Sequence, residues 1–383
     1  MVVFQALTWE ARDGEDEHLI SIFGKTEDGK SVCVTTAFTP YFFIKLPGGM
    51  DSQKVQRIYD ILSNQCKDSL VAYSLMKSKD VWGFQNNEEF AYMKINFKDL
   101  QARRLVDSFL RRPLDRSPEL YELFGVRNVK VYESNLDPVL RLMHRTGIQS
   151  TGWLDSGERC VRSHIANVDT DLFCNDWTTL KPVARDDIAP FVVASVDIEC
   201  NSSTGKFPDA NIPGDACFQI AISLCKFGSD EPYDKTCLCY KETDSNLEGC
   251  DIRSYATEKE MLEAFQKYLH SKDIDIITGW NIFGFDMEYI YKRAQINKCN
   301  YDFYNLGKLK DIDSQLVIKK LSSSALGDNF LKLLPMSGRF IFDLFHEVKK
   351  GYKLDSYKLD SVSKLYLGDQ KIDMAPKEMF ARY

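Results

Sequence analysis

One stretch, residues 191–200, constrains the fold of this chain more than any other. It begins as a nearly unbroken apolar run after Pro190 and ends with Asp197 and Glu199, two positions apart. A Val-rich run of this length predicts a buried strand. Because side chains alternate between the faces of a strand, Asp197 and Glu199 share one face. Two like charges held close together in a buried sheet need a counter-charge, for which a divalent cation is the usual solution; a strand end with both acids in water is the alternative.

Strands and helices alternate beyond residue 190, which predicts an α/β domain. Strands are expected at 218–224, 274–278 and 340–343, with helices at 258–270, 286–295 and 357–367. The earlier part predicts a mixed α+β domain, with strands at 2–9, 18–23 and 39–47, helices at 51–62, 97–110 (Leu100, Leu105 and Leu110 inward) and 133–144, and a hairpin turn at Asp28 and Gly29. We place the two domains at residues 1–185 and 186–383.

The length and the net charge of the chain limit the number of domains and the classes of function that we consider. A chain of 383 residues favours two domains. The net charge of −7 argues mildly against a protein that wraps duplex DNA. It does not exclude an enzyme that holds a short strand through local basic patches such as Arg103–Arg104 and Lys349–Lys350, although for each patch alone we favour solvated surface charge as the explanation. No apolar run is long enough to span a membrane and no secretory signal pattern opens the chain, so we expect no membrane partner.

The eleven cysteines predict free thiols. None forms a CxxC pair, and Cys237 and Cys239 are expected on one side of a strand. This argues against a zinc site or a disulfide framework and favours a reducing compartment inside the cell.

A second carboxylate region follows the strand at 274–278. A glycine turn there leads to Asp286, which begins a helix. An Asp in a first helical turn commonly compensates the helix dipole or caps the helix. The functional alternative makes Asp286 a third acid beside Asp197 and Glu199. Three acids at strand ends, without a Ser-His-Asp pattern or a P-loop, suit Mg²⁺ or Mn²⁺ rather than zinc.

The order Asp-Ile-Glu at 197–199, followed about 85 residues later by Asn-x-x-x-Phe-Asp at 281–286, resembles the first two exonuclease motifs of the B-family DNA polymerases. Further blocks resemble the delta-type replicative members, in spellings closest to those of large DNA viruses: Tyr-Glu-Ser-Asn (132–135), Ser-Thr-Gly-Trp (150–153), Ser-Ala-Leu-Gly-Asp (324–328), Gly-Arg before Asp343, Tyr-Lys-Leu-Asp-Ser through Val-Ser (357–363) and Leu-Tyr-Leu-Gly (365–368). The resemblance covers essentially the whole chain.

The resemblance implies an RNase H-like exonuclease domain, a mixed sheet with flanking helices, behind an α+β N-terminal domain with nucleic-acid-binding elements. It implies 3′→5′ proofreading hydrolysis of DNA by two Mg²⁺ or Mn²⁺ ions, with Asp197, Glu199 and Asp286 as metal-binding catalytic acids. Asn281 and Phe285 would bind the 3′-terminal nucleotides, although core packing is an equal explanation for Phe285. The implied partners are a single-stranded 3′ end, primer–template DNA and replication accessory factors, in the nucleus or a viral replication compartment.

Several features remain open at this stage. Asp343 either steers the metal-binding acids or caps the next helix, and we favour the cap. The aromatic run 41–43 either packs in a core, which we favour, or stacks on bases. Asp169–Asp171 imitates a polymerase palm motif and is expected in a loop, and Tyr240 with Asp244 imitates an exonuclease motif by chance.

The resemblance also implies what the chain lacks. The family's third exonuclease motif, Tyr-x-x-x-Asp, is expected just beyond Tyr383, and no other palm or fingers motif occurs. We therefore expect no nucleotide incorporation and weak or absent DNA hydrolysis by the chain alone, because one carboxylate ligand is missing. The alternative function is a catalytically silent nucleic-acid-binding or interaction module with an exonuclease fold.

Overall fold

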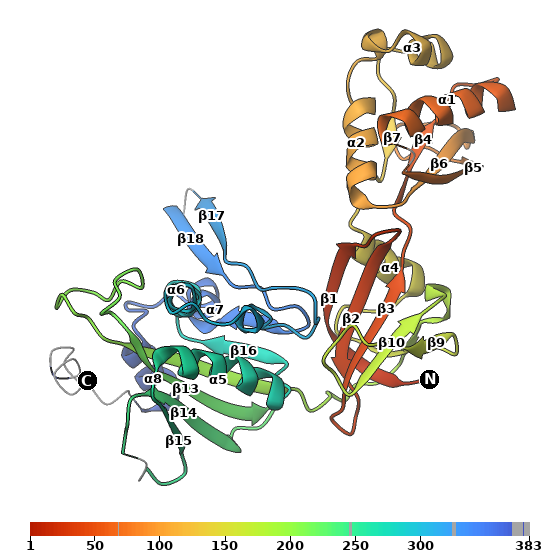
Figure 1. The fold of residues 1–383 in the computed structure, drawn as a ribbon. Coiled ribbons are helices and arrows are strands. Elements are labelled where there is room, and N and C mark those ends of the chain that lie inside the picture. Colours follow the sequence, from red (N-terminus) through yellow and green to blue (C-terminus); the bar gives the residue numbers. More distant parts are fainter. Residues whose placement is uncertain (68, 245–246, 324–326, 370–377, 379–383) are drawn as a thin grey trace.

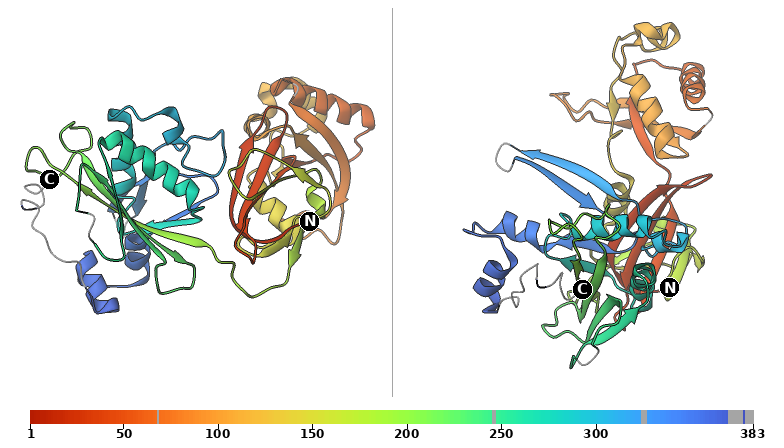
Figure 2. Two further views of the ribbon diagram at one scale, coloured as in Figure 1. Left: turned by 60° about the horizontal axis from the view of Figure 1, so that its bottom comes forward. Right: turned by 60° about the vertical axis from the view of Figure 1, so that its left-hand side comes forward.

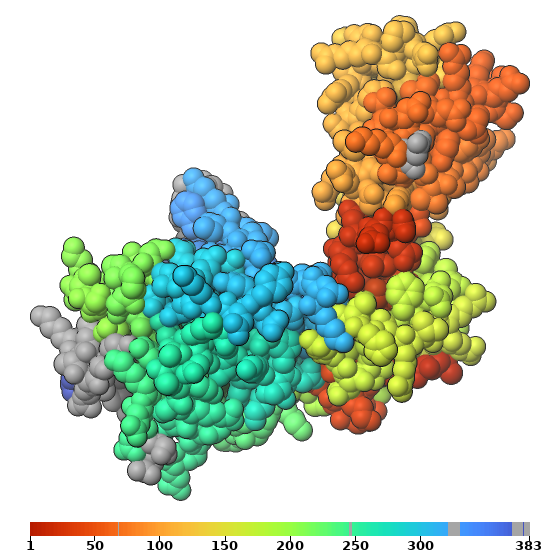
Figure 3. All heavy atoms as spheres, in the orientation of Figure 1, coloured from red at the N-terminus to blue at the C-terminus, as the bar shows by residue number. Residues whose placement is uncertain are grey.

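The computed structural model describes residues 1–67, 69–244, 247–323, 327–369 and 378 (Figure 1). Three larger sheets organise this part of the chain: two within residues 3–183 and a third that begins at residue 192. Figure 3 shows the body formed by the second of these sheets standing well apart from the body of the third, and both views of Figure 2 show the same separation. The first sheet lies between them.

The first sheet has seven strands in the order β11-β8-β1-β2-β3-β10-β9. The expected hairpin turn between β2 and β3 is confirmed, with Gly29 at φ +85°. The prediction that residues 169–171 form a loop is wrong, because Thr170 and Asp171 begin a strand that pairs with β3 in parallel. The bounds are β1 (Val3–Asp13), β2 (His18–Lys25), β3 (Ser31–Ala37), β8 (Trp153–Asp155), β9 (Cys160–Arg162), β10 (Thr170–Cys174) and β11 (Lys181–Val183), with α4 (Pro138–Thr146) and η2 (Trp177–Thr179) beside them.

The second sheet has four strands in the order β5-β6-β4-β7. Its elements follow along the chain as βαββαβ, with a 3-10 helix and a short α-helix added before the last strand. The predicted helices α1 and α2 are confirmed, but Leu105 was predicted to point inward and is about half exposed. The sequence analysis missed β5 and β6, and most of β5 is exposed, so it lacks an apolar pattern. The bounds are β4 (Tyr41–Lys45), α1 (Ser52–Gln65), β5 (Leu70–Ser78), β6 (Phe90–Phe97), α2 (Leu100–Leu110), η1 (Leu114–Arg116), α3 (Pro118–Phe124) and β7 (Val131–Tyr132).

The third sheet is mixed, with six strands in the order β15-β14-β13-β12-β16-β19. β12 lies at its centre, antiparallel to β13 and parallel to β16. The helix predicted at 258–270 is confirmed as α5 (Glu258–Ser271). Its apolar face is buried in the core with Ala194 and Val196 and consists of Met261, Leu262, Phe265, Tyr268 and Leu269.

The bounds of the elements in and around the third sheet are β12 (Val192–Cys200), β13 (Cys217–Lys226), β14 (Asp234–Tyr240), β15 (Asp251–Tyr255), α5 (Glu258–Ser271), β16 (Ile276–Gly279), α6 (Asp286–Ile296), η3 (Tyr301–Tyr304), β17 (Val317–Ser323), β18 (Gly327–Leu333), β19 (Phe340–Asp343), α7 (Leu344–Gly351) and α8 (Leu359–Leu367). β17 and β18 form a separate antiparallel hairpin.

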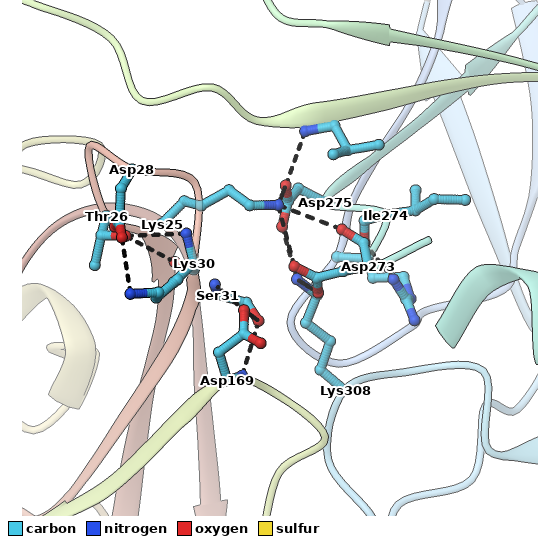
Figure 4. Close-up of polar contacts among 12 residues, drawn as sticks. Lys25, Thr26, Asp28, Lys30, Ser31, Asp169, Asp273, Ile274, Asp275 and Lys308 are labelled. Carbon is cyan, nitrogen blue, oxygen red and sulfur yellow. Dashed lines mark hydrogen bonds and ion pairs between the residues drawn. The ribbon is translucent and has the colours of Figure 1, made fainter. Parts of the chain in front are cut away.

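A buried ionic cluster joins the first sheet to the third (Figure 4). Lys25 at the end of β2 and Lys308 both contact Asp275, each with an N–O distance of 2.6 Å, and both also pair with Asp273. Lys25, Lys308 and Asp275 are each 2% exposed. The Asp275 carboxylate also accepts a 2.8 Å hydrogen bond from the backbone N–H of Val192. The same cluster therefore fixes the interface and the start of the central strand.

The described helices include none long and apolar enough to cross a membrane. All eleven cysteines are free, and the Sγ atoms of Cys237 and Cys239 lie 3.5 Å apart on one side of β14, as their spacing predicted.

Candidate active site

The carboxylates of Asp197 and Glu199 lie on the same face of β12. Their neighbours Val196 and Ile198 are buried in the core on the other face, so the predicted alternation is confirmed. The carboxylate face is more open than predicted, because Ser195 and Asp197 are exposed and Glu199 is half-buried. The central strand therefore buries one face only and presents its two acids on an accessible surface.

Asp286 lies against the same strand. It begins α6, is 4% exposed, and its Oδ1 accepts a 3.3 Å hydrogen bond from the backbone N–H of Ile198. Burial raises the pKa of Asp286 to about 7, and the negative charge of Asp197 adds to this effect. No side chain caps α6 through a hydrogen bond, so Asp286 does not act as an ordinary cap. The fold thus brings Asp286 close to Asp197.

The turn between β16 and α6 is shaped by close packing. A Cβ on Gly279 would lie 2.5 Å from the Val196 carbonyl oxygen of β12, and a Cβ on Gly284 would lie 2.4 Å from Oδ1 of Asn281. Asn281 itself has φ +62°, a left-handed conformation that Asn tolerates better than most residues. Gly279 therefore lets the turn approach β12 closely, and Gly284 leaves room for the Asn281 side chain within the turn.

We expect Gly279→Ala to lower the free energy of unfolding by about 2 kcal/mol, because the added methyl group meets backbone that cannot rotate away. Gly284→Ala should cost less, since the Asn281 side chain can move. Gly351→Ala is the matched control, because a Cβ there meets nothing within 4 Å. Urea unfolding of the three variants measures the order, and equal stability of Gly279→Ala and Gly351→Ala would contradict this account of the turn.

Asp343 holds the turn from the neighbouring strand. Its carboxylate accepts hydrogen bonds from the backbone N–H groups of Asn281 at 2.8 Å and Phe283 at 2.9 Å. It also accepts a 3.0 Å bond from the N–H of Phe345 and so caps α7. The favoured explanation, a helix cap, is confirmed. The same carboxylate also holds the turn that leads to Asp286.

Phe285 is half-buried and packs against the core beside Tyr289, with ring centroids 4.9 Å apart. The Phe285 ring also contacts the ring of Phe207, with centroids 5.2 Å apart. Phe207 is 78% exposed on the loop after β12. The sequence analysis missed Phe207. An aromatic residue inside a turn-rich polar loop was the available signal.

The loop that carries Phe207 is anchored by two buried charges. Burial opposes ionisation of Asp215, but its carboxylate accepts hydrogen bonds from the backbone N–H of Asp209 and from the N–H and hydroxyl of Ser203, and these hold its pKa below the ordinary value. Arg293 of α6 donates to the carbonyls of Ala210, Ile212 and Pro213 and pairs with Glu258 of α5 at 2.6 Å. The loop is therefore fixed at its base, and its tip with Phe207 remains exposed.

The donor set suits a hard cation. Across the described ranges, no three His, Cys, Asp or Glu side chains lie in an arrangement that could hold a metal ion, so Glu199 does not close a three-acid set with Asp197 and Asp286. All three candidate ligands nevertheless offer carboxylate oxygens, which Mg²⁺ and Mn²⁺ prefer. Burial is the main cause of the raised pKa of Asp286 and the negative charge of Asp197 adds to it, so a bound cation would favour the ionised carboxylate.

Comparison with known proteins identifies the family. Residues 129–362 match the family model of the DNA polymerase family B exonuclease domain. The DNA polymerase of Paramecium bursaria Chlorella virus NY2A is 31% identical over the whole chain, which spans 41% of that polymerase. The DNA polymerase delta catalytic subunit of Schizosaccharomyces pombe is 28% identical over 93% of the chain, which spans 33% of the subunit. The chain thus covers about a third to two fifths of these relatives.

The fold agrees with a solved structure. The family B DNA polymerase of Pyrobaculum calidifontis superposes with a TM-score of 0.66 over 99% of this chain and 42% of that polymerase, at 16% sequence identity. The predicted fold class, an RNase H-like exonuclease domain preceded by an α+β region, is confirmed. Exonuclease domains of this family generally depend on divalent metal ions, and its polymerases bind DNA. The predicted resemblance is also confirmed: the chain belongs to the B-family DNA polymerases and carries their exonuclease domain.

Proposed function

We propose that this chain forms the N-terminal region (1–185) and the 3′→5′ proofreading exonuclease region (186–383) of a DNA-directed DNA polymerase. The observation that carries the proposal is that Asp286 is buried against β12, close to Asp197. The acids follow one another along the chain in the order typical of the family's exonuclease motifs. The family match over residues 129–362 supports the reaction class.

Asp197 and Asp286, with Glu199 on the same face of β12, are the carboxylates that would hold Mg²⁺ or Mn²⁺ ions, two in the complete site that the family implies. Among the described residues these three acids do not yet form a closed set. When bound, such ions activate a water molecule and stabilise the leaving oxygen of a phosphodiester. In the overall reaction the water oxygen forms a bond to phosphorus, the bond to the 3′-oxygen breaks, and a nucleoside 5′-monophosphate leaves. The buried side of the site, formed by Asp286 and the start of α6, would limit the access of bulk water to one side of the reacting group.

Asn281 and Phe285 would position the 3′-terminal nucleotides. Phe285 is supported from behind by Tyr289, and Asn281 is fixed through its backbone by Asp343. Phe207 projects beside Phe285 and offers a second aromatic surface to an unstacked base. This arrangement favours a single-stranded end over a duplex end, because stacking requires an exposed base face.

The proposed setting is DNA replication, in a nucleus or a viral replication compartment. Primer–template DNA and replication accessory factors would be partners of the polymerase.

The direct test is the polarity of cleavage. This chain spans only 41% of its viral relative, so the assay uses a polymerase of the relatives' length that carries these residues. The polymerase is mixed, in excess, with a 5′-labelled single-stranded oligonucleotide. We expect stepwise shortening from the 3′ end with Mg²⁺ and none with EDTA. Shortening from the 5′ end, or shortening that persists in EDTA, would contradict the proposal; binding without any cleavage would favour the silent-module alternative.

A further inference from the structure

Two cysteines face each other across the hairpin at the edge of the first sheet. β9 is the edge strand of that sheet and pairs with β10 in antiparallel register, with Cys160 directly opposite Cys174 (Figure 1). The next bond along the ladder runs from the Asn175 N–H to the Arg159 carbonyl at 3.1 Å. Because hydrogen-bonded and non-hydrogen-bonded pairs alternate along such a ladder, Cys160 and Cys174 form a non-hydrogen-bonded pair. The Cα atoms of these pairs are typically about 4.5 Å apart, which is within the range that a disulfide spans.

Both thiols point towards one backbone carbonyl. The Sγ atom of Cys160 lies 3.0 Å from the carbonyl oxygen of Ser156, and the Sγ atom of Cys174 lies 3.9 Å from the same oxygen. The two thiols also form a hydrogen bond with each other. The strand register therefore already brings the two sulfur atoms within reach of a covalent bond.

The pair combines access to solvent with a stabilised thiolate. Cys160 is half-buried, whereas Cys174 is fully buried. The hydrogen bond from Cys160 lowers the pKa of Cys174 to about 6 against the effect of burial, and hydrogen bonds to Thr179 and to the backbone of Asp176 act in the same direction. The same hydrogen bond raises the pKa of Cys160, so Cys160 keeps the proton of the pair. A thiolate beside a second, partly exposed thiol is the arrangement found in redox-active cysteines.

The other close cysteine pairs lack one part of this combination. Cys200 and Cys217 are also opposite each other, on β12 and β13, but both are buried. Cys237 and Cys239 lie two positions apart on one strand, where Cα atoms are about 6.6 Å apart, near the upper limit for a disulfide. The hydrogen bond from Cys237 lowers the pKa of Cys239 to about 7. This last pair therefore matches Cys160 and Cys174 in acidity but not in geometry.

The hairpin that carries Cys160 and Cys174 contacts residues 308–310. The N–H of Asn167, in the turn between β9 and β10, donates to the carbonyl of Lys308 at 2.7 Å. The N–H of Lys310 donates to the carbonyl of Ile165 in the same turn at 2.9 Å. Lys308 also belongs to the buried ionic cluster that joins the first sheet to the third. A covalent bond across the hairpin would therefore hold the turn against this interface.

We propose that Cys160 and Cys174 form a reversible oxidation site, at which a hydroperoxide generates a disulfide that holds the hairpin against residues 308–310. In the singly ionised pair, one sulfur attacks a peroxide oxygen, the oxygen–oxygen bond breaks, and hydroxide leaves, so that a sulfenic acid forms. The second sulfur then forms the S–S bond, the S–O bond breaks, and the departing hydroxide takes the remaining thiol proton and becomes water. The two sulfurs together lose two electrons, which the peroxide gains. In a reducing compartment the dithiol is the resting form and the disulfide is transient.

The test is oxidation of the folded 383-residue chain by hydrogen peroxide, followed by alkylation of the remaining thiols and tryptic mass spectrometry. Trypsin cleaves after Arg159 and Arg162, so the proposed disulfide joins residues 160–162 to the next tryptic peptide, which contains Cys174. We expect this linked pair to form at least about tenfold faster than a disulfide within β14 and to disappear on treatment with dithiothreitol.

Oxidation should also slow local opening of the interface. The disulfide removes conformations in which β9 separates from β10, so amide hydrogen exchange in residues 163–169 and 308–310 should slow at least about threefold. Exchange in residues 218–224 of β13 is the internal reference and should not change. Unchanged exchange at 308–310 in the disulfide-linked chain would contradict the claim that the bond holds this contact.

Cys160→Ser and Cys237→Ser form a matched pair of variants. Each replaces the half-buried, hydrogen-bond-donating thiol of a close pair in which the partner has a lowered pKa. Cys160→Ser should abolish both the linked peptides and the slower exchange after oxidation, and Cys237→Ser should keep both. Circular dichroism establishes that each variant is folded. Linked peptides that form only in urea, linked peptides that form no faster than the disulfide within β14, or slower exchange that persists in Cys160→Ser would overturn the proposal.

Discussion

Replacing Asp197 and Glu199 together by Ala should lower Mg²⁺-dependent 3′→5′ cleavage by at least about 10³-fold in a polymerase that carries this chain. Ions in such sites stabilise the transition state by several kcal/mol, and each 1.36 kcal/mol corresponds to tenfold in rate. Both side chains project from the accessible face of β12 and neither belongs to the apolar core, so the loss should not come from unfolding. Single-turnover cleavage of a labelled single strand measures the effect.

The matched control is Asp230→Ala with Glu231→Ala. These adjacent acids are exposed between β13 and β14, so the control makes the same change of net charge in the same domain. It should leave the cleavage rate within twofold of the wild type. Comparable losses in the two double variants would mean that general charge, rather than this carboxylate site, supports cleavage.

The second large effect concerns stability. Asp275→Asn should lower the free energy of unfolding by roughly 3 kcal/mol, because it leaves the buried cations Lys25 and Lys308 without their closest counter-charge. Asn keeps the size of the side chain and an acceptor for the Val192 N–H, so the loss reports the charge. Thermal and urea unfolding measure it.

Asp28→Asn is the control, because Asp28 pairs with Lys30 at an exposed turn of the same interface region. It should leave the melting temperature unchanged. If Asp275→Asn were equally silent, the buried cluster would not be what fixes the interface between the first and third sheets.

The buried ionic cluster of Lys25, Lys308, Asp273 and Asp275 stabilises the fold only within a range of pH. Burial opposes ionisation of Asp273, but the charges of Lys308 and Lys25 outweigh it and hold the pKa of Asp273 below its ordinary value of 3.8. Burial likewise opposes the charge of Lys25, and Asp275 and Asp273 outweigh it, so the pKa of Lys25 is raised above 10.5. The Asp273 contribution is complete above pH 3.8 and is lost on further acidification. The Lys25 contribution is complete below pH 10.5 and is lost as the pH rises past its raised pKa.

Much of the α/β region could be predicted because its signals are local. The run at 192–200 and the amphipathic pattern of α5 specify buried faces whatever surrounds them. β5 could not be predicted in this way, because most of its side chains are exposed and only its pairing with β6 makes it a strand. Thr170 and Asp171 were likewise assigned to a loop, since parallel pairing with β3 leaves no trace in the local sequence.

In the candidate site, too, the features set by local sequence could be predicted and those set by tertiary packing could not. The alternation along β12 predicted that Asp197 and Glu199 share a face, and the glycine turn predicted that Asp286 starts a helix. The position of Asp286 against the Ile198 N–H depends on how closely β16 and its turn pack on β12, which spacing alone does not reveal. The dual contacts of Asp343 and the exposed ring of Phe207 arise from segments that meet only in three dimensions.

The central claim is that the acids of β12 and α6 form a site for divalent metal ions. Its most direct test is a titration of the 383-residue chain with Mn²⁺, in which electron paramagnetic resonance of the free ion measures how much Mn²⁺ is bound. The account predicts that the wild type and Asp230→Ala with Glu231→Ala bind Mn²⁺ equally, and that Asp197→Ala with Glu199→Ala binds it at least tenfold more weakly. Undiminished binding in the last variant would contradict the assignment of the site.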